Sequence, residues 1–140
     1  MASATPAAKP GVDELRKSPT MSYLLDAAEG GQDIGHYGRL TLAMVGSKFM
    51  ETDELVETLL KSGGADETEV KAMVQQVVER GYNPPSRARL QEWSAEQDFP
   101  LMPNPDDPDG GNLYRELTMP DEVIDSIEEY REQKLEASEA

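Results

Sequence analysis

The chain has 140 residues with 37% hydrophobic content, which allows one domain with a modest core, and no cysteine, which excludes disulfides, thiolate metal sites and thiol nucleophiles. Its 28 acidic and 13 basic residues give a net charge of −15, which disfavours nucleic acids and anionic membranes and favours basic partners, although acidic surfaces also serve solubility alone. No segment is apolar enough to span a bilayer or to act as a secretion signal, so we expect a cytoplasmic protein without membrane contact.

The first predicted elements are a tail and a short helix. Residues 1–19 are small, interrupted by prolines and nearly free of large apolar side chains, which predicts a flexible tail. Helical spacing of apolar residues over 21–28 predicts a short helix. Thr20 or Ser22 is its expected capping residue, and the glycine pair 30–31 ends it.

Two helices are predicted between residues 37 and 62. The segment 37–50 carries a wide apolar stripe, so we expect a helix that is buried on a broad face; the stripe consists of Leu40, Leu42, Ala43, Met44, Val45 and Phe49. The next helix has acids in its first turn and ends at Gly63-Gly64. Its expected core face consists of Leu55, Val56, Leu59 and Leu60.

The following two helices have clear start signals. Asp66 followed by Glu69 resembles a capping box, and Gly81 marks the end of the helix that it starts. The core face of that helix consists of Val70, Met73, Val74, Val77 and Val78. After a pair of prolines, Ser86 is the expected N-cap of a further helix that extends past Trp93.

Residues 98–117 are predicted to form an extended arm. Prolines at positions 100, 103, 105 and 108 fix their own φ and push the preceding residue towards extended geometry, so we expect no helix in this segment. Large apolar side chains flank an acidic Pro-Gly turn: Phe99, Leu101 and Met102 before it, and Leu113, Tyr114 and Leu117 after it. Leaving each exposed would forgo about 1.5–3 kcal/mol, so both clusters should dock, either on this chain's own helices or on a partner.

Residues 118–140 are predicted to form an acidic amphipathic helix. Its narrow apolar stripe includes Val123, Ile127 and Tyr130, and its other faces are acidic. Residues 98–140 hold thirteen acids and three bases, so two thirds of the net charge of −15 lies there. We expect the stripe of this helix to be covered by a partner.

These elements predict an all-α fold: a small helical cluster of about five or six helices with a Pro-rich extended arm before an acidic C-terminal helix. The expected divisions are a flexible tail at 1–19, a helical core at 20–97, the arm at 98–117 and the C-terminal helix at 118–140. The sequence has no alternating β-type runs and no internal repeat.

Signals for catalysis and metal binding are weak. Asp106, Asp107 and Asp109 resemble calcium ligands, but the glycine and glutamate positions of an EF-hand do not align with this segment, which leaves only another type of calcium loop. His36 is the only histidine, and no partner follows it at the spacing of a metal pair. We therefore expect no catalysis, cofactor or metal. A small ligand-binding or acid-base enzyme at His36 is the third hypothesis.

A helix-turn-helix arrangement is a second hypothesis. The three helices between residues 37 and 80 resemble such a cluster in their lengths. Only Arg80, Arg87 and Arg89 form a basic group, and acids lie close to them in the sequence, so binding of nucleic acid is disfavoured. The second hypothesis is thus a regulatory helix-turn-helix-like nucleic-acid module or a DNA mimic.

The first hypothesis is a non-catalytic, acidic, helical accessory or adaptor protein, a small subunit bound to a larger protein partner. It rests on the small core, on the apolar side chains of the arm and on the weakness of the catalytic signals. The sequence specifies no oligomeric state. The predicted partner-binding residues are Phe99, Leu101, Met102, Leu113, Tyr114, Leu117, Val123, Ile127 and Tyr130.

Overall fold

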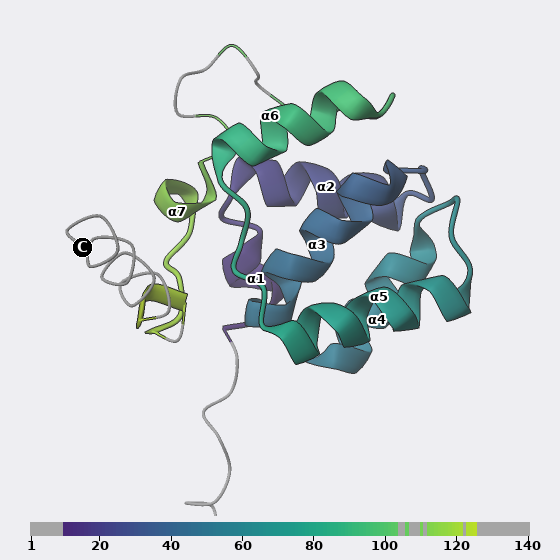
Figure 1. Ribbon diagram of the computed structural model, residues 1–140, viewed down its shortest axis with the longest axis horizontal. Helices are drawn as coiled ribbons and strands as arrows, with labels where there is room; N and C mark the ends of the chain where they lie inside the picture. The colour runs from purple at the N-terminus through teal and green to yellow at the C-terminus, as the bar shows by residue number, and fades with distance from the viewer. Residues whose placement is uncertain (1–9, 104–105, 107–109, 111, 122, 126–140) are drawn as a thin grey trace, which may run out of the picture.

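The computed structural model describes residues 10–103, 106, 110, 112–121 and 123–125. These residues form seven helices and no strand, so the predicted all-α fold is confirmed (Figure 1). Asp121 and residues 123–125 are also helical. The helices are α1 (Val12–Leu15), α2 (Pro19–Glu29), α3 (Gly35–Phe49), α4 (Thr52–Lys61), α5 (Glu67–Arg80), α6 (Arg87–Glu96) and α7 (Leu113–Glu116).

Helix α3 lies at the centre of the fold. It contacts α1, α2, α4 and α5, and Figure 1 shows it between α2 and α6 on one side and α4 and α5 on the other. Leu42, Val45 and Phe49 of α3 are buried, which confirms the predicted broad apolar face. Leu40 and Met44 are only half-buried, so one side of α3 stays partly open.

Helical structure begins earlier than the sequence predicts, inside the segment expected to be a tail. Leu15 of α1 is fully buried, and the N–H of Gly11 donates to the carbonyl oxygen of Phe49 at 2.6 Å. Ser18 caps α2 instead of either predicted residue, because Pro19 takes the first helical position, where no N–H is needed. Leu15 therefore belongs to the core, and the chain is attached to α3 from Gly11 onwards.

The starts of α5 and α6 agree with the sequence predictions. Asp66 Oδ1 accepts a hydrogen bond from the N–H of Glu69 at 2.9 Å, and Ser86 Oγ accepts one from the N–H of Arg89 at 3.2 Å. Gly81 ends α5 with a φ of 63°, in the left-handed region that favours glycine. These local contacts fix where the chain turns between α5 and α6.

Contacts of Arg39 and a backbone hydrogen bond join the turn before α3 to the turn after α4. Arg39 Nη1 donates to Asp33 Oδ1 and to the carbonyl oxygen of Gly63, both at 3.0 Å. The N–H of Gly63 donates in turn to the carbonyl oxygen of Gln32 at 3.0 Å. Hydrogen bonds from the N–H of Gly35 and from the Arg39 guanidinium hold the pKa of Asp33 below its ordinary value. The two turns are thereby held together.

The described part of the predicted arm packs on the helical core. Phe99 is half-buried and stacks on Tyr23, with ring centroids 5.5 Å apart. Tyr114, also half-buried, donates its hydroxyl to the carbonyl oxygen of Pro84 at 2.6 Å. These contacts correspond to docking on the chain's own helices, the first of the two alternatives. The other four residues of the two apolar clusters are buried: Leu101, Met102, Leu113 and Leu117.

Helix α7 corrects the expectation that the whole of 98–117 is non-helical. It lies beyond the last proline of the segment, so no proline ring prevents helical geometry there. Glu116 of α7 places its carboxylate at the N-terminus of α2, where it accepts from the Ser18 hydroxyl and, at 3.3 Å, from the N–H of Thr20. The helix dipole favours an anion at this position, so the contact stabilises the docking of α7 on α2.

Most of the predicted C-terminal helix lies outside the described residues. Val123 is fully buried in the core, whereas Ile124 beside it is 44% exposed. Ile127 and Tyr130, two of the predicted contact residues, lie outside the described residues. The structure therefore bears only on the first turn of this helix.

Leu101→Ala is expected to lower the free energy of unfolding by about 2–5 kcal/mol, because it removes a fully buried side chain and leaves a cavity. Ile124→Ala is the control and should change it by less than about 0.5 kcal/mol, since Ile124 is exposed. Urea unfolding of the full chain, followed by circular dichroism, measures both. An unchanged midpoint for Leu101→Ala would contradict the packing of this segment on the core.

Candidate functional site

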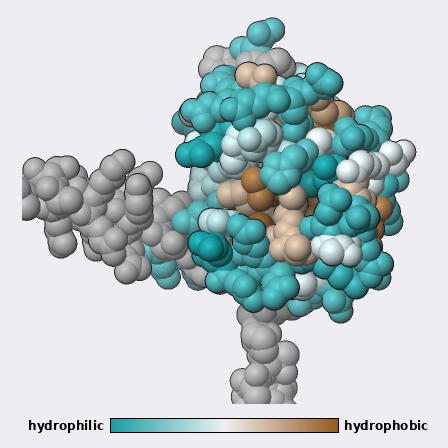
Figure 2. Space-filling model, turned by 45° about the vertical axis from the view of Figure 1, so that its right-hand side comes forward, coloured by the Kyte–Doolittle hydropathy of each residue, from teal (hydrophilic) through white to brown (hydrophobic). Residues whose placement is uncertain are grey.

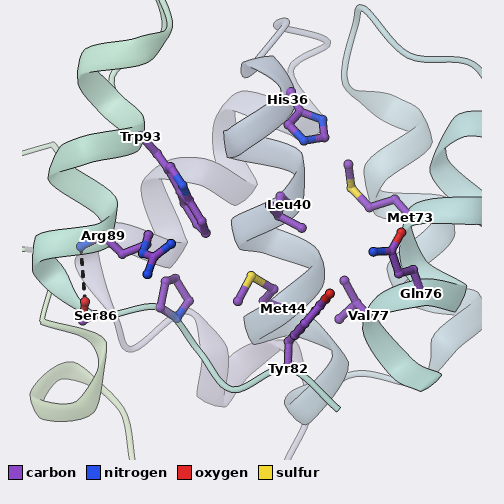
Figure 3. A pocket seen from close by; sticks show the side chains of 11 residues that line it. His36, Leu40, Met44, Met73, Gln76, Val77, Tyr82, Ser86, Arg89 and Trp93 are labelled. Carbon is purple, nitrogen blue, oxygen red and sulfur yellow. Dashed lines mark hydrogen bonds between the residues drawn. The ribbon is translucent and has the colours of Figure 1, made fainter. Parts of the chain in front are cut away.

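A groove of about 530 Å³ lies between α3, α5, α6 and the loop before α6; we call it the α3–α6 groove. Figure 3 shows side chains from the three helices facing this shared space. Apolar surface ringed by hydrophilic residues is also visible in the middle of the face drawn in Figure 2. The groove is lined by His36, Leu40, Met44, Met73, Gln76, Val77, Tyr82, Pro85, Ser86, Arg89 and Trp93.

Helix α3 supplies one wall of the groove. His36, Leu40 and Met44 follow one another at intervals of four residues, which places them on one face of the helix (Figure 3). Leu40 and Met44 are half-buried and form an apolar floor, whereas His36 is exposed at the start of the helix. The wall is therefore apolar along most of its length and polar at one end.

Helix α5 and the loop that follows it supply a second wall. Met73 and Val77 lie one turn apart, and Gln76 lies next to them on the exposed rim (Figure 3). Tyr82, from the loop between α5 and α6, closes the end near Met44, and Pro85 of the same loop also lines the groove. This side of the groove is uncharged.

Helix α6 supplies the third wall through Arg89 and Trp93. The indole of Trp93 stacks on Tyr37 of α3, with centroids 5.2 Å apart and an angle of 15° between the rings. The guanidinium carbon of Arg89 lies 5.9 Å from the centroid of the Trp93 ring, within cation–π distance. A hydrogen bond to the Glu96 carboxylate raises the pKa of Tyr37, so the phenol stays neutral at physiological pH.

Polar contacts of Gln97 hold the end of α6 against the start of α3. Gln97 Oε1 accepts from the N–H of Tyr37 at 2.9 Å, and its Nε2 donates to the carbonyl oxygen of Ile34 at 2.8 Å. The same Nε2 donates to the carbonyl oxygen of Phe99 at 2.9 Å. Leu90 is the one residue of α6 that is buried. Because so little of α6 packs into the core, the space between α6 and α5 is not filled.

The groove differs in charge from the rest of the chain. None of the described residues that line it is acidic, although the chain has a net charge of −15. Arg89 carries a positive charge, and His36 gains one when it is protonated. The centres of protein interfaces are enriched in aromatic residues, methionine and arginine and depleted in acids, and the groove has this composition.

The partner-binding residues predicted from the sequence do not line this groove. Of the nine predicted partner-binding residues, Ile127 and Tyr130 lie outside the described residues, and Phe99 and Tyr114 are half-buried against the chain's own core. The remaining five are buried in that core: Leu101, Met102, Leu113, Leu117 and Val123. Both arm clusters therefore pack on the chain's own core, and a different apolar surface, that of the α3–α6 groove, is accessible.

The structure describes only part of the set of residues considered for catalysis and metal binding. His36 is exposed and lies edge-on to Tyr37, with ring centroids 5.3 Å apart. Asp106 is exposed, and Asp107 and Asp109 lie outside the described residues. Within the described ranges, no group of three or more histidine, aspartate or glutamate side chains is arranged to hold a metal ion.

Two of the three basic residues considered for nucleic-acid binding, Arg87 and Arg89, have partners within the chain. Arg87 Nε donates to the carbonyl oxygen of Gly110 at 2.8 Å. Arg89 lies beside Trp93, and its Nε is 3.9 Å from a carboxylate oxygen of Glu92. Of these contacts, that of Arg89 with Glu92 is the kind of charge compensation by a nearby acid that the sequence favours.

Comparisons with known proteins add no relative. Protein-family models, curated proteins and solved structures were searched, and no significant match to this chain was found. In the part of the chain that the structure describes, no helix combines the length and the apolar character needed to cross a membrane. The α3–α6 groove itself is therefore the feature of the molecule that points to a function.

Arg89→Gln is expected to reduce iodide quenching of the Trp93 fluorescence by roughly twofold and to increase caesium quenching, because it removes a positive charge beside the indole. Trp93 is the only tryptophan of the chain, so the signal reports on the groove alone. Quenching constants are measured at constant ionic strength. Arg80→Gln is the control, since it removes the same charge outside the groove. An equal effect of both changes on the quenching constants would contradict a local effect of the Arg89 charge on Trp93.

Proposed function

We propose that this chain is a non-catalytic, acidic, helical accessory or adaptor protein of the cytoplasm that binds a larger protein partner through the α3–α6 groove. One observation carries the proposal: an accessible groove built from methionine, aromatic and arginine side chains, with no acid among its described lining residues, in a chain of net charge −15. An apolar segment of the partner would insert its side chains between α3, α5 and α6.

The side chains that line the groove suit this task. Met44 and Met73 are unbranched and polarizable, so they adapt to apolar side chains of different shape. Trp93 is held by its stacking on Tyr37, so its large contact surface is fixed before the partner arrives. Arg89 and Gln76 on the rim supply hydrogen-bond donors that orient a backbone or a carboxylate. This combination of a fixed aromatic anchor and an adaptable floor is typical of interface hot spots.

The groove changes the role of the residues first expected to bind a partner. The arm clusters around Leu101 and Leu113 are covered by the chain's own helices, so the proposal does not need them at the interface. The acidic segment with Ile127 and Tyr130 stays a predicted second contact, because it lies outside the described residues.

A small-ligand site is the second candidate, and the size of the groove favours it. Ligand pockets occupy about 300–1,000 Å³, and the α3–α6 groove of about 530 Å³ falls in this range. His36 and Arg89 would then face a polar group of the ligand. The groove is open along its rim, as the exposure of Gln76, Ser86 and Arg89 shows, which suits a protein segment better than an enclosed small molecule.

The double variant Met73→Glu/Arg89→Glu is expected to reduce recovery of the partner at least about tenfold, because it places acids in an acid-free groove and removes two contact groups. The measurement is quantitative mass spectrometry after affinity purification of the tagged chain from its native cell.

The matched control is Arg80→Glu/Ala95→Glu, which makes the same change in net charge at exposed positions outside the groove. Circular dichroism confirms that each variant keeps its helices. Proteins recovered equally with the wild type and with Met73→Glu/Arg89→Glu would contradict the proposal, and so would the absence of any protein recovered specifically with the wild type.

A further inference from the structure

A second groove lies between α4 and α5 and has a volume of about 660 Å³; we call it the α4–α5 groove. Its apolar floor consists of Val56 and Leu60 from α4 and Val74 and Val78 from α5. Leu60 is 37% exposed and Val78 is 47% exposed, which makes them two of the three large hydrophobic residues that are exposed in the described part of the chain. The floor is therefore accessible to a ligand.

The helix periodicity explains why this apolar surface is left uncovered. On α4, Leu55 and Leu59 point into the core, and Val56 and Leu60 follow them by one position around the helix. On α5, Val77 is buried and Val78 next to it is exposed. Each helix is thus apolar over a wider arc than the core can cover. Leu60 and Val78 are the exposed members of the apolar floor, whereas Val56 is half-buried and Val74 is buried at its base.

Acidic side chains surround this apolar floor. Four acids and one lysine line the groove, a net charge of −3: Asp53, Glu57, Glu67, Glu79 and Lys71. The ammonium of Lys71 lies 2.6 Å from a carboxylate oxygen of Glu67, so the only cation among the described lining residues is already paired. The unmatched charge on the rim is therefore negative, in contrast to the acid-free α3–α6 groove.

We propose that the α4–α5 groove binds a basic amphipathic helix of a partner protein. The apolar face of such a helix would cover Leu60 and Val78, and its lysine or arginine side chains would meet the acids on the rim. A helix of about 14 residues is about 21 Å long, which matches the length of α5, the longer of the two walls. The apolar floor and the length of its longer wall thus suit an amphipathic helix, and charge complementarity selects a basic one.

The α4–α5 groove is separate from the α3–α6 groove, so binding at one can be tested independently of the function proposed for the other. At 100° per residue, Met73 and Val77 lie on one face of α5, and Val74 and Val78 lie towards a different face. The residue sets that line the two grooves have no member in common. One chain could therefore hold two partner segments at once, on two faces of α5.

A second copy of this chain is a poorer occupant. Self-association through this face would bring the rim acids of two copies together, and like charges placed opposite one another destabilise an interface. Nucleic acids and anionic lipid surfaces are repelled for the same reason. A basic amphipathic helix both neutralises the negative charge of the rim and covers the apolar floor.

The test uses a synthetic helical peptide of about 15 residues, with leucines on one face and lysines elsewhere, and a counterpart in which every lysine is glutamate. The full chain is titrated with each peptide and followed by amide NMR shifts. The basic peptide is expected to bind with a Kd on the order of 10 μM and to shift residues of the α4–α5 groove, and the acidic counterpart to bind at least about tenfold more weakly. Raising the salt concentration should weaken the binding of the basic peptide.

Two matched variants separate the groove from the overall charge. Glu57→Lys/Glu79→Lys reverses the charge of two rim residues and should lower the affinity for the basic peptide at least about tenfold. Asp98→Lys/Asp125→Lys makes the same change in net charge at exposed positions outside the groove and should preserve binding within about twofold. Leu60→Gln/Val78→Gln should lower the affinity for the basic peptide without unfolding the chain, since both side chains are exposed.

Several outcomes would overturn the proposal. Equal weakening by both lysine pairs would show that binding follows net charge alone. Equal affinity for the basic and acidic peptides, or shifts confined to the α3–α6 groove, would show that the rim acids select nothing. Absence of binding at millimolar peptide would exclude the site, and sedimentation of the free chain as a dimer sensitive to Leu60→Gln/Val78→Gln would assign the surface to a second copy.

Discussion

The whole structure depends on covering α3, which is apolar around most of its circumference. Such a helix is stable in water only when neighbours bury it on nearly every side. Helices α1, α2, α4 and α5 cover most of it, and Gly46 lets α4 come close, since a Cβ at this position would lie 2.7 Å from a methyl carbon of Leu55. Helix α6 is held near α3 by Gln97 but does not close over Leu40 and Met44. The α3–α6 groove is the part of α3 that the chain leaves uncovered.

Local signals predicted much of the fold, and contacts between distant segments account for what was missed. The caps at Asp66 and Ser86 bond to atoms three residues away, so their geometry is visible in the sequence. Arg39 instead donates to atoms six and 24 residues away, at Asp33 and Gly63, and no local pattern reveals that pairing. Leu15 was assigned to a tail for the same reason, because only the folded core shows that an isolated apolar residue has a site to fill.

The candidate site could be predicted less well than the fold. Each helix that lines the α3–α6 groove has an apolar stripe, and a stripe by itself predicts burial, not which part of it stays accessible. That part is set by how far α5 and α6 lie from each other, which depends on the turn at Gly81 and on the contacts of Gln97. Trp93, a large side chain on a helix with one buried residue, was the available signal. The sequence instead predicts a contact surface at the apolar residues of the arm, because a proline-rich segment cannot form a helix that would bury them.

The two grooves share α5 and differ in charge, and this difference bears on how an adaptor would keep two partners apart. A basic helix suited to Glu57 and Glu79 would meet Arg89 if it entered the α3–α6 groove, where no described lining residue is acidic. An acidic or neutral segment suited to Arg89 would meet the four rim acids if it entered the α4–α5 groove. Repulsion of the wrong ligand contributes to specificity as much as attraction of the right one. The net charge of −15 by itself does not specify a partner. The uneven distribution of the acids does, because one groove has no acid among its described lining residues and the other has acids on its rim.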